Sequence, residues 1–117
     1  MKVAVIGSRS IAYDRLQDTA FAYLERYIPV NATEIVSGGA MGADKLAERY
    51  ADLHHLKKTV LLPDYGKYGK RAPLVRDEEI VRTADTVIAF WDGKSRGTAY
   101  TVSFAVAEGV PVKIIRL

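Results

Sequence analysis

Cysteine is absent from the 117-residue sequence. Its absence excludes disulfide frameworks, thiolate zinc sites and cysteine nucleophiles, and it is compatible with a reducing compartment. The sequence also lacks any apolar run approaching the roughly 20 residues that a membrane-spanning helix needs. The two histidines, His54 and His55, have no metal-binding partner at ligand spacing. We therefore expect a cytoplasmic protein with no membrane partner, no metal and no cofactor.

Neither sign of charge dominates. There are 17 basic and 14 acidic side chains, which gives a net charge of +3, too small by itself to indicate nucleic-acid binding. Apolar residues make up 49% of the chain, enough for a packed core. No repeat, low-complexity segment or linker divides the sequence, which predicts a single domain over residues 1–117.

Short runs rich in valine and isoleucine alternate with segments of helical periodicity. The expected strands are 2–7, 33–37, 58–63, 85–91 and 111–117, and the expected helices are 13–28, 41–53, 73–83 and 98–109. Residues 64–72, "DYGKYGKRA", are expected to form an irregular loop. This order predicts an α/β fold, a three-layer Rossmann-like sandwich around a five-stranded parallel sheet. Right-handed crossovers favour the strand order 3-2-1-4-5.

The loops that follow the strands share one edge of such a sheet, the carboxyl edge. Eight of the nine glycines fall in these loops, all but Gly109. Six cations fall there as well: Arg9, Lys67, Lys70, Arg71, Lys94 and Arg96. Glycine permits close approach of a ligand to the backbone, and helix N-termini present free amides to anions. The edge is therefore a candidate anion site, most plausibly for phosphate.

The loop "SGGAMGAD", residues 37–44, is the first candidate ligand loop. Gly38 and Gly39 can turn sharply and expose amides, and Gly42 keeps the first helical turn narrow. We favour ligand contact over turn formation for these glycines. Asp44 either accepts a hydrogen bond from a sugar hydroxyl or is a first-turn carboxylate favoured by the helix dipole. The glycine spacing matches neither a dinucleotide fingerprint nor a P-loop.

The second candidate loop is "WDGKSRG", residues 91–97, which leads into a helix that Gly97 and Thr98 open. Arg96 either meets a phosphate or is an exposed loop cation, and Trp91 is expected to pack at the sheet edge. Arg76 either points into the same cleft or forms a surface ion pair with Glu79. The candidate ligand-binding residues are Gly7, Ser8, Arg9, Ser37, Gly38, Gly39, Gly42, Asp44, Arg76, Ser95, Arg96, Gly97 and Thr98.

The segments "VSGGAMGADKLAERYA", "ADTVIAFWDG" and "SRGTAYTVSFA" together resemble the SLOG superfamily. The likeness is greatest to its small YspA/YpsA-like proteins, with DprA (Smf) and the LOG phosphoribohydrolases as relatives, and it covers almost the whole chain. It implies a Rossmann-like domain that binds a nucleotide or nucleotide-derived ligand. It also implies that proteins of this kind pair as homodimers, for which we expect the third and fourth helices to form the interface.

The LOG enzymes, according to this resemblance, cleave the glycosidic bond of a nucleoside 5′-monophosphate. They use an arginine, which Arg76 matches as a catalytic candidate, and a glutamate shortly after the glycine–threonine pair. Tyr100 and Thr101 occupy the positions where that glutamate should fall. Glycosidic cleavage needs a carboxylate, which Asp44 or Asp92 would have to supply.

Three functions therefore stay open at the level of the sequence. The first is a binding module for a nucleotide or a nucleotide derivative, for example in a sensor. The second is a phosphoribohydrolase. The third, ranked last because the cations cluster at one loop edge instead of forming a long basic stripe, is single-stranded DNA binding.

Overall fold

The computed structural model describes residues 1–8, 14–39 and 42–117. Its centre is a five-stranded parallel sheet in the order β3-β2-β1-β4-β5, as the sequence predicts. The strands are β1 (Lys2–Gly7), β2 (Glu34–Ser37), β3 (Lys57–Val60), β4 (Thr86–Trp91) and β5 (Val112–Arg116). β1 and β4 are parallel neighbours, and on either side of them successive strands are added in opposite directions, so the loops after these two strands lie side by side.

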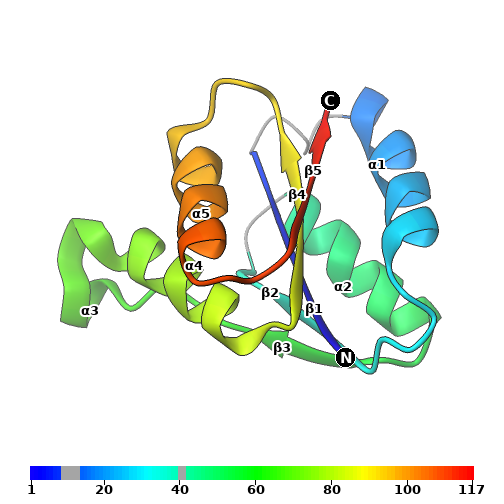
Figure 1. Ribbon diagram of the computed structural model, residues 1–117, viewed down its shortest axis with the longest axis horizontal. Coiled ribbons are helices and arrows are strands. Elements are labelled where there is room, and N and C mark those ends of the chain that lie inside the picture. Colours follow the sequence, from blue (N-terminus) through cyan, green and yellow to red (C-terminus); the bar gives the residue numbers. More distant parts are fainter. Residues whose placement is uncertain (9–13, 40–41) are drawn as a thin grey trace.

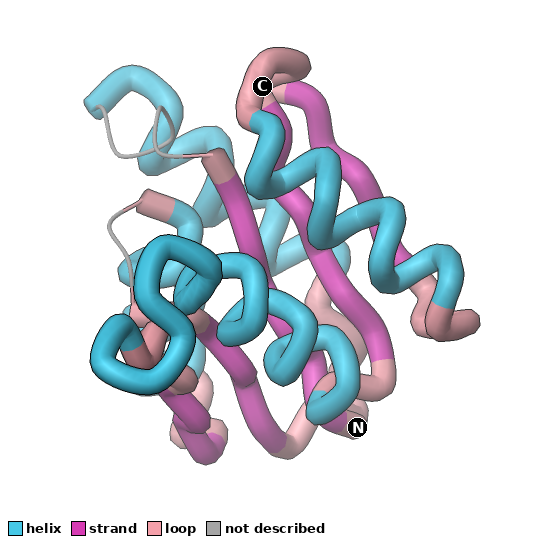
Figure 2. The backbone as a smooth tube through the Cα atoms, turned by 90° about the vertical axis from the view of Figure 1, so that its left-hand side faces the viewer, coloured by secondary structure: helices cyan, strands magenta, loops and turns pink. Residues whose placement is uncertain are grey.

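Helices cover both faces of this sheet. They are α1 (Asp14–Tyr27), α2 (Ala43–Leu53), α3 (Tyr65–Tyr68), α4 (Ala72–Thr83) and α5 (Arg96–Ala107), with the 3₁₀ turn η2 (Gly69–Arg71). Figure 1 shows α1 and α2 on one side of the strands and α4 and α5 on the other, with α3 projecting outward. Figure 2 looks at the sheet from the side of α3, α4 and α5. Within the described residues, no helix is long and apolar enough to cross a membrane.

Strand alternation builds two separate cores. Val3 and Val5 of β1 face α1 and α2, where they join Leu24 in one buried cluster. The intervening Ala4 and Ile6 face α4 and α5 and join a second cluster. Side chains on both faces of the central strands are thus buried, which explains why those strands are continuous apolar runs.

The segment 64–72 is not an irregular loop, so that prediction was wrong. Residues 65–68 form the short helix α3 and residues 69–71 form η2. The Asp64 carboxylate caps α3 by accepting a hydrogen bond from the Lys67 amide at 3.1 Å. A single helical turn is too short to show periodicity, so only this capping residue marked it in the sequence.

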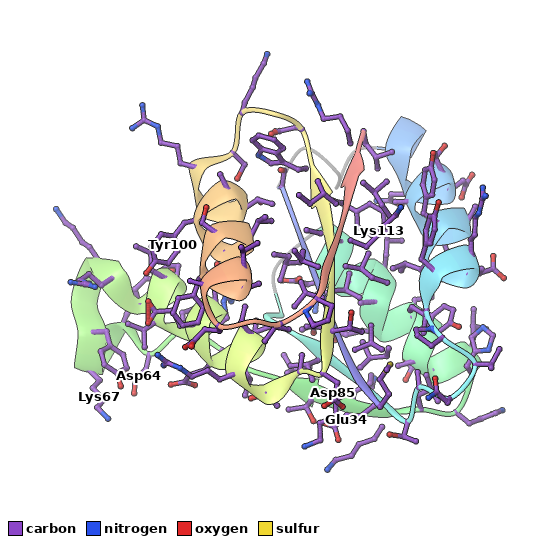
Figure 3. All side chains as sticks on the ribbon, viewed as in Figure 1. Glu34, Asp64, Lys67, Asp85, Tyr100 and Lys113 are labelled. Carbon is purple, nitrogen blue, oxygen red and sulfur yellow. The ribbon has the colours of Figure 1, made fainter. Side chains whose placement is uncertain are left out.

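Side-chain hydrogen bonds close the amino edge of the sheet. The Lys2 amide donates to Asp85 Oδ2 at 2.7 Å, and Thr59 Oγ1 donates to Glu34 Oε2 at 2.8 Å. Figure 3 shows Glu34 and Asp85 together at this end of the molecule. The Thr59 hydrogen bond lowers the pKa of Glu34, with smaller contributions from nearby lysines. These contacts give the amino edge a structural role.

Gly7 lets β1 and α2 approach closely at the carboxyl edge. A Cβ atom at this position would lie 2.5 Å from Ala43 Cβ, at the first residue of α2. Neither atom belongs to a flexible side chain that could move away. The sequence therefore needs glycine at the end of β1 for packing, whatever else the residue does.

We expect Gly7→Ala to lower the free energy of unfolding by about 1–3 kcal/mol, because the added methyl group must push β1 and α2 apart. Urea unfolding measures this change. Gly97→Ala is the matched control, since nothing lies within 4 Å of a Cβ atom at Gly97. Equal stability losses in the two variants would contradict the packing account.

Candidate functional site

A cavity of about 190 Å³ opens at the carboxyl edge beside the point where the strand order reverses. Four elements meet there: the end of β1, the start of α2, one face of α4 and the start of α5. The lining residues are Ile6, Gly7, Asp44, Pro73, Arg76, Asp77, Ile80, Ser95, Gly97, Thr98 and Thr101. The two loops that the sequence marked as candidates therefore contribute to one site.

The first turn of α5 forms one wall. Ser95 caps the helix, because its hydroxyl accepts a hydrogen bond from the Thr98 amide at 3.3 Å. The Ala99 amide bonds to the Ser95 carbonyl at 3.2 Å. The Gly97 amide has no acceptor within the described part of the chain, as is usual for the first N–H groups of a helix. Gly97 lines the cavity, so the start of α5 brings the positive end of the helix dipole to it.

Hydroxyl groups tie the end of β1 to this helix start. The buried Ser8 hydroxyl accepts a hydrogen bond from the Asp92 amide at 3.2 Å and lies 3.5 Å from Thr98 Oγ1. Ser95 Oγ donates to the same Thr98 oxygen at 3.2 Å. Ser8 thus supports the α5 turn without lining the cavity, and its predicted ligand contact stays a prediction.

Arg76 reaches across the edge from α4 to the loop after β2. Its Nη1 donates to the Gly38 carbonyl at 2.7 Å, and its Nε donates to Asp77 Oδ1 at 2.7 Å. The side chain is only 13% exposed. The alternative of a surface ion pair with Glu79 is wrong, because Asp77 is the ionic partner and the guanidinium lines the cavity.

The glycines after β2 serve this arrangement. A Cβ atom at Gly38 would lie 2.6 Å from Arg76 Nη1, so glycine makes room for the guanidinium. Gly39 and Gly42 have φ angles of 72° and 85°, which glycine adopts without strain. None of the three is among the residues that line the cavity. Turn formation and packing explain all three glycines in this structure, and the direct ligand contact that the sequence favoured stays a prediction.

Asp77 is a cavity residue that sequence reasoning missed. Its Oδ2 accepts a hydrogen bond from the buried Thr101 hydroxyl at 3.1 Å, in addition to the Arg76 contact. Burial raises the pKa of Asp77, and this effect outweighs the opposing influence of Arg76 and Thr101. A signal was present: Asp77 lies on the same helical stripe as Pro73 and Ile80, where a core-facing apolar residue is normal.

Asp44 lies at the start of α2, is 8% exposed and lines the cavity. Together with Asp77 it gives the cavity two carboxylates against the single guanidinium of Arg76. The cavity itself is therefore not positively charged. Lys94 and Arg96 are exposed on the rim, outside the lining.

The loop after β4 is fixed by its own side chains. Asp92 Oδ1 accepts hydrogen bonds from the amides of Lys94 and Ser95, both at 2.8 Å. Trp91 Nε1 donates to the Ser95 carbonyl at 3.0 Å, which fits the expected structural role of this residue. Arg96 begins α5 instead of preceding it. Asp92 is thus occupied in shaping the loop and does not line the cavity.

Two predicted residues have not yet been placed. Arg9 lies outside the described residues. Ser37 ends β2 with its hydroxyl buried and without a hydrogen-bond partner within the described residues, but it does not line the cavity. Among the described residues no group of three or more histidine, cysteine, aspartate or glutamate side chains could hold a metal ion.

Fold and site together define a parallel α/β domain with a polar cleft at its topological switch point, where such sheets bind ligands. The chain is 36% identical over 84 residues to the gene 61 protein of Mycobacterium phage D29, covering 67% of each sequence. It belongs to the same family as that protein. A scan against protein-family models finds no match.

Two solved structures share the fold. DNA processing protein A (DprA) from Streptococcus pneumoniae superposes with a TM-score of 0.77 at 23% identity, over 99% of this chain and 50% of that one. DprA from Helicobacter pylori gives 0.70 at 23% identity, over 100% of this chain and 66% of that one. The chain thus spans about half to two thirds of these proteins. The likeness to DprA is shown at the level of fold, and assignment to the YspA/YpsA-like or LOG branch stays a prediction.

Asp77 should leave a signature in the pH dependence of stability. Because its pKa is raised in the folded state, its contribution is fully present below the unfolded carboxyl pKa of about 3.9 and is lost as pH rises through the folded-state pKa. Wild type should therefore lose stability relative to Asp77→Asn as pH rises from about 3.5 to 7. Urea unfolding of both proteins across this range measures the difference. A difference that stays constant, or that changes in the opposite direction, would refute the raised pKa.

Proposed function

We propose that the protein binds a nucleotide or nucleotide-derived ligand at the carboxyl edge of its sheet. The observation that carries this proposal is the meeting of the α2 and α5 starts in one cavity beside the switch point. Helix starts supply amides and a positive dipole to anions, and the carboxyl edge is the usual ligand position in this architecture.

The charges of the cleft favour one orientation of the ligand. Two carboxylates inside the cavity, Asp44 and Asp77, suit hydroxyl or amino donors of a sugar or base. The phosphate suits the rim, where the Gly97 amide and the exposed Arg96 start α5. The volume of the cavity fits this orientation. At about 190 Å³ it is below the roughly 300–1,000 Å³ of sites that enclose a whole small molecule, so part of the ligand must lie at the rim.

Single-stranded DNA binding is the second candidate. The structure from Helicobacter pylori describes a single-stranded DNA binding mode of DprA, and this chain shares its fold over its whole length. In favour of this candidate, three exposed cations follow one another closely on α3 and η2: Lys67, Lys70 and Arg71. A homodimer through α4 and α5 stays a prediction.

The phosphoribohydrolase alternative gains a carboxylate from the fold. Asp77 contacts Thr101, one of the two residues found where the family resemblance leads us to expect a glutamate.

If the protein is an enzyme of this class, incubation with nucleoside 5′-monophosphates should release free base, and Asp77→Asn should abolish the release. Chromatography of the reaction mixture measures it. Release that persists undiminished in Asp77→Asn would exclude Asp77 from catalysis.

The binding proposal predicts an effect of Arg96 on phosphorylated ligands. Arg96→Gln should weaken binding of a nucleoside 5′-monophosphate by about two- to five-fold, since an exposed ionic contact contributes up to about 1 kcal/mol. Binding of the corresponding nucleoside should be unchanged. Isothermal titration calorimetry measures both affinities.

Arg82→Gln is the matched control for this experiment. It removes the same charge from the last turn of α4, away from the cleft, where Arg82 pairs with Glu108. Equal weakening by the two variants would show only a general electrostatic effect. No binding of any nucleoside monophosphate to the wild-type protein would contradict the proposed function in this form.

A further inference from the structure

A second cavity, of about 260 Å³, adjoins the first on the other side of α4. It is lined by Leu62, Asp64, Lys67, Tyr68, Ala72, Val75, Arg76 and Glu79. Figure 3 shows Asp64 and Lys67 of this group around α3, at the end of the molecule away from α1. This cavity was not foreseen from the sequence, because α3 itself was not.

The two cavities lie against two faces of the same helix. Pro73, Asp77 and Ile80 of α4 line the first cavity, whereas Ala72, Val75 and Glu79 line the second. These sets follow the three- and four-residue spacing of adjacent helical faces. Arg76 is the one described residue that lines both cavities, so its guanidinium forms their common wall.

Arg76 retains hydrogen-bonding capacity at this wall. A guanidinium has five N–H donors. Arg76 Nε donates to Asp77, and Nη1 donates to the Gly38 carbonyl. Within the described residues Nη2 has no acceptor, so its two N–H groups are available to donate to phosphate oxygens.

The second cavity differs from the first in having an aromatic ring. Tyr68 is 36% exposed, and Lys67 Nζ lies 5.2 Å from the centroid of its ring. An accessible aromatic ring with cations nearby is the arrangement on which nucleic-acid bases stack. The exposed side chain of Leu62 provides apolar surface beside it.

The size of each cavity is consistent with a ligand that occupies both. Each is smaller than the range of about 300–1,000 Å³ for sites that enclose a small molecule. We infer that the protein takes a ligand of two nucleotide-like units joined through phosphate, with one unit in each cavity and the linking phosphate at Arg76. This inference rests on the proposed nucleotide-binding function and specifies its ligand class.

The test compares one-unit with two-unit ligands. The probes are thymidine 5′-monophosphate against 5′-phosphorylated dithymidylate, and AMP against ADP-ribose, titrated into the full chain. At least one two-unit ligand should bind about tenfold or more tightly than its one-unit counterpart. Further tightening with longer oligothymidylate, lost at high salt, would assign the site to single-stranded nucleic acid. Preference for ADP-ribose would assign it to a pyrophosphate-linked small molecule.

Tyr68→Ala should weaken binding of the preferred two-unit ligand by about five- to a hundred-fold, the range for loss of one base–aromatic stack. It should leave the one-unit affinity unchanged. Tyr65→Ala is the matched control, because Tyr65 lies on the same helix, is 59% exposed and lines neither cavity. Thermal unfolding of both variants checks that each is folded.

The outcomes separate the two proposals. If mononucleotides bind but two-unit ligands bind no tighter, or if Tyr68→Ala weakens both kinds equally, the two-unit site is refuted while nucleotide binding stands. If neither kind of ligand binds, both proposals fall. If Tyr68→Ala and Tyr65→Ala act alike on the two-unit ligand, the second cavity is not part of the site.

Discussion

The hydrogen bond from Arg76 to the Gly38 carbonyl is the contact on which the carboxyl edge depends. It fastens α4 to the loop after β2 across 38 residues of sequence, and it holds the guanidinium between two cavities. Asp77 holds the same guanidinium from the side of its own helix. Gly38 allows the contact, since any side chain there would collide with Arg76. Glycine at position 38, in the loop after β2, is therefore explained by the space that the Arg76 side chain needs.

This arrangement changes the electrostatic character of the site. A largely buried arginine with a carboxylate partner is not a free cation, and Asp44 adds a further carboxylate to the first cavity. The site then combines acceptors inside with helix amides and exposed cations at its rim. Such a distribution suits a ligand that is itself divided into a donor-rich sugar or base and an anionic phosphate.

The fold could be predicted from the sequence because its signals are local and repeated. Valine- and isoleucine-rich runs alternating with helical periods determine a parallel sheet, and crossover handedness limits the strand order. The sequence also predicted that Asp44 lies near Ser95, Gly97 and Thr98, because this depends only on which loops share an edge of the sheet. The role of Gly38 could not be predicted, because it arises from the approach of α4 to a distant loop.

The remaining gaps have similar causes. Asp77 was hidden by its neighbours, since "RDEE" in a helix normally indicates a solvated face, and only packing shows that one of these acids points into a cavity. The second cavity depends on α3, a single turn stabilised by the Asp64 cap that leaves no periodic pattern. Sequence periodicity thus located the sheet and its carboxyl edge, whereas the division of that edge into two cavities could be seen only in the tertiary structure.

The central claim is that a nucleotide binds at Arg76 and the start of α5. Two-dimensional ¹H–¹⁵N NMR during titration with a nucleoside 5′-monophosphate tests it most directly, because the Arg76 Nε–H signal and the Gly97 and Thr98 amides report on the site individually. The account predicts saturable shifts of these three signals with one common affinity. Saturable shifts confined to the amino edge, around Glu34 and Asp85, with these three signals unmoved, would contradict it.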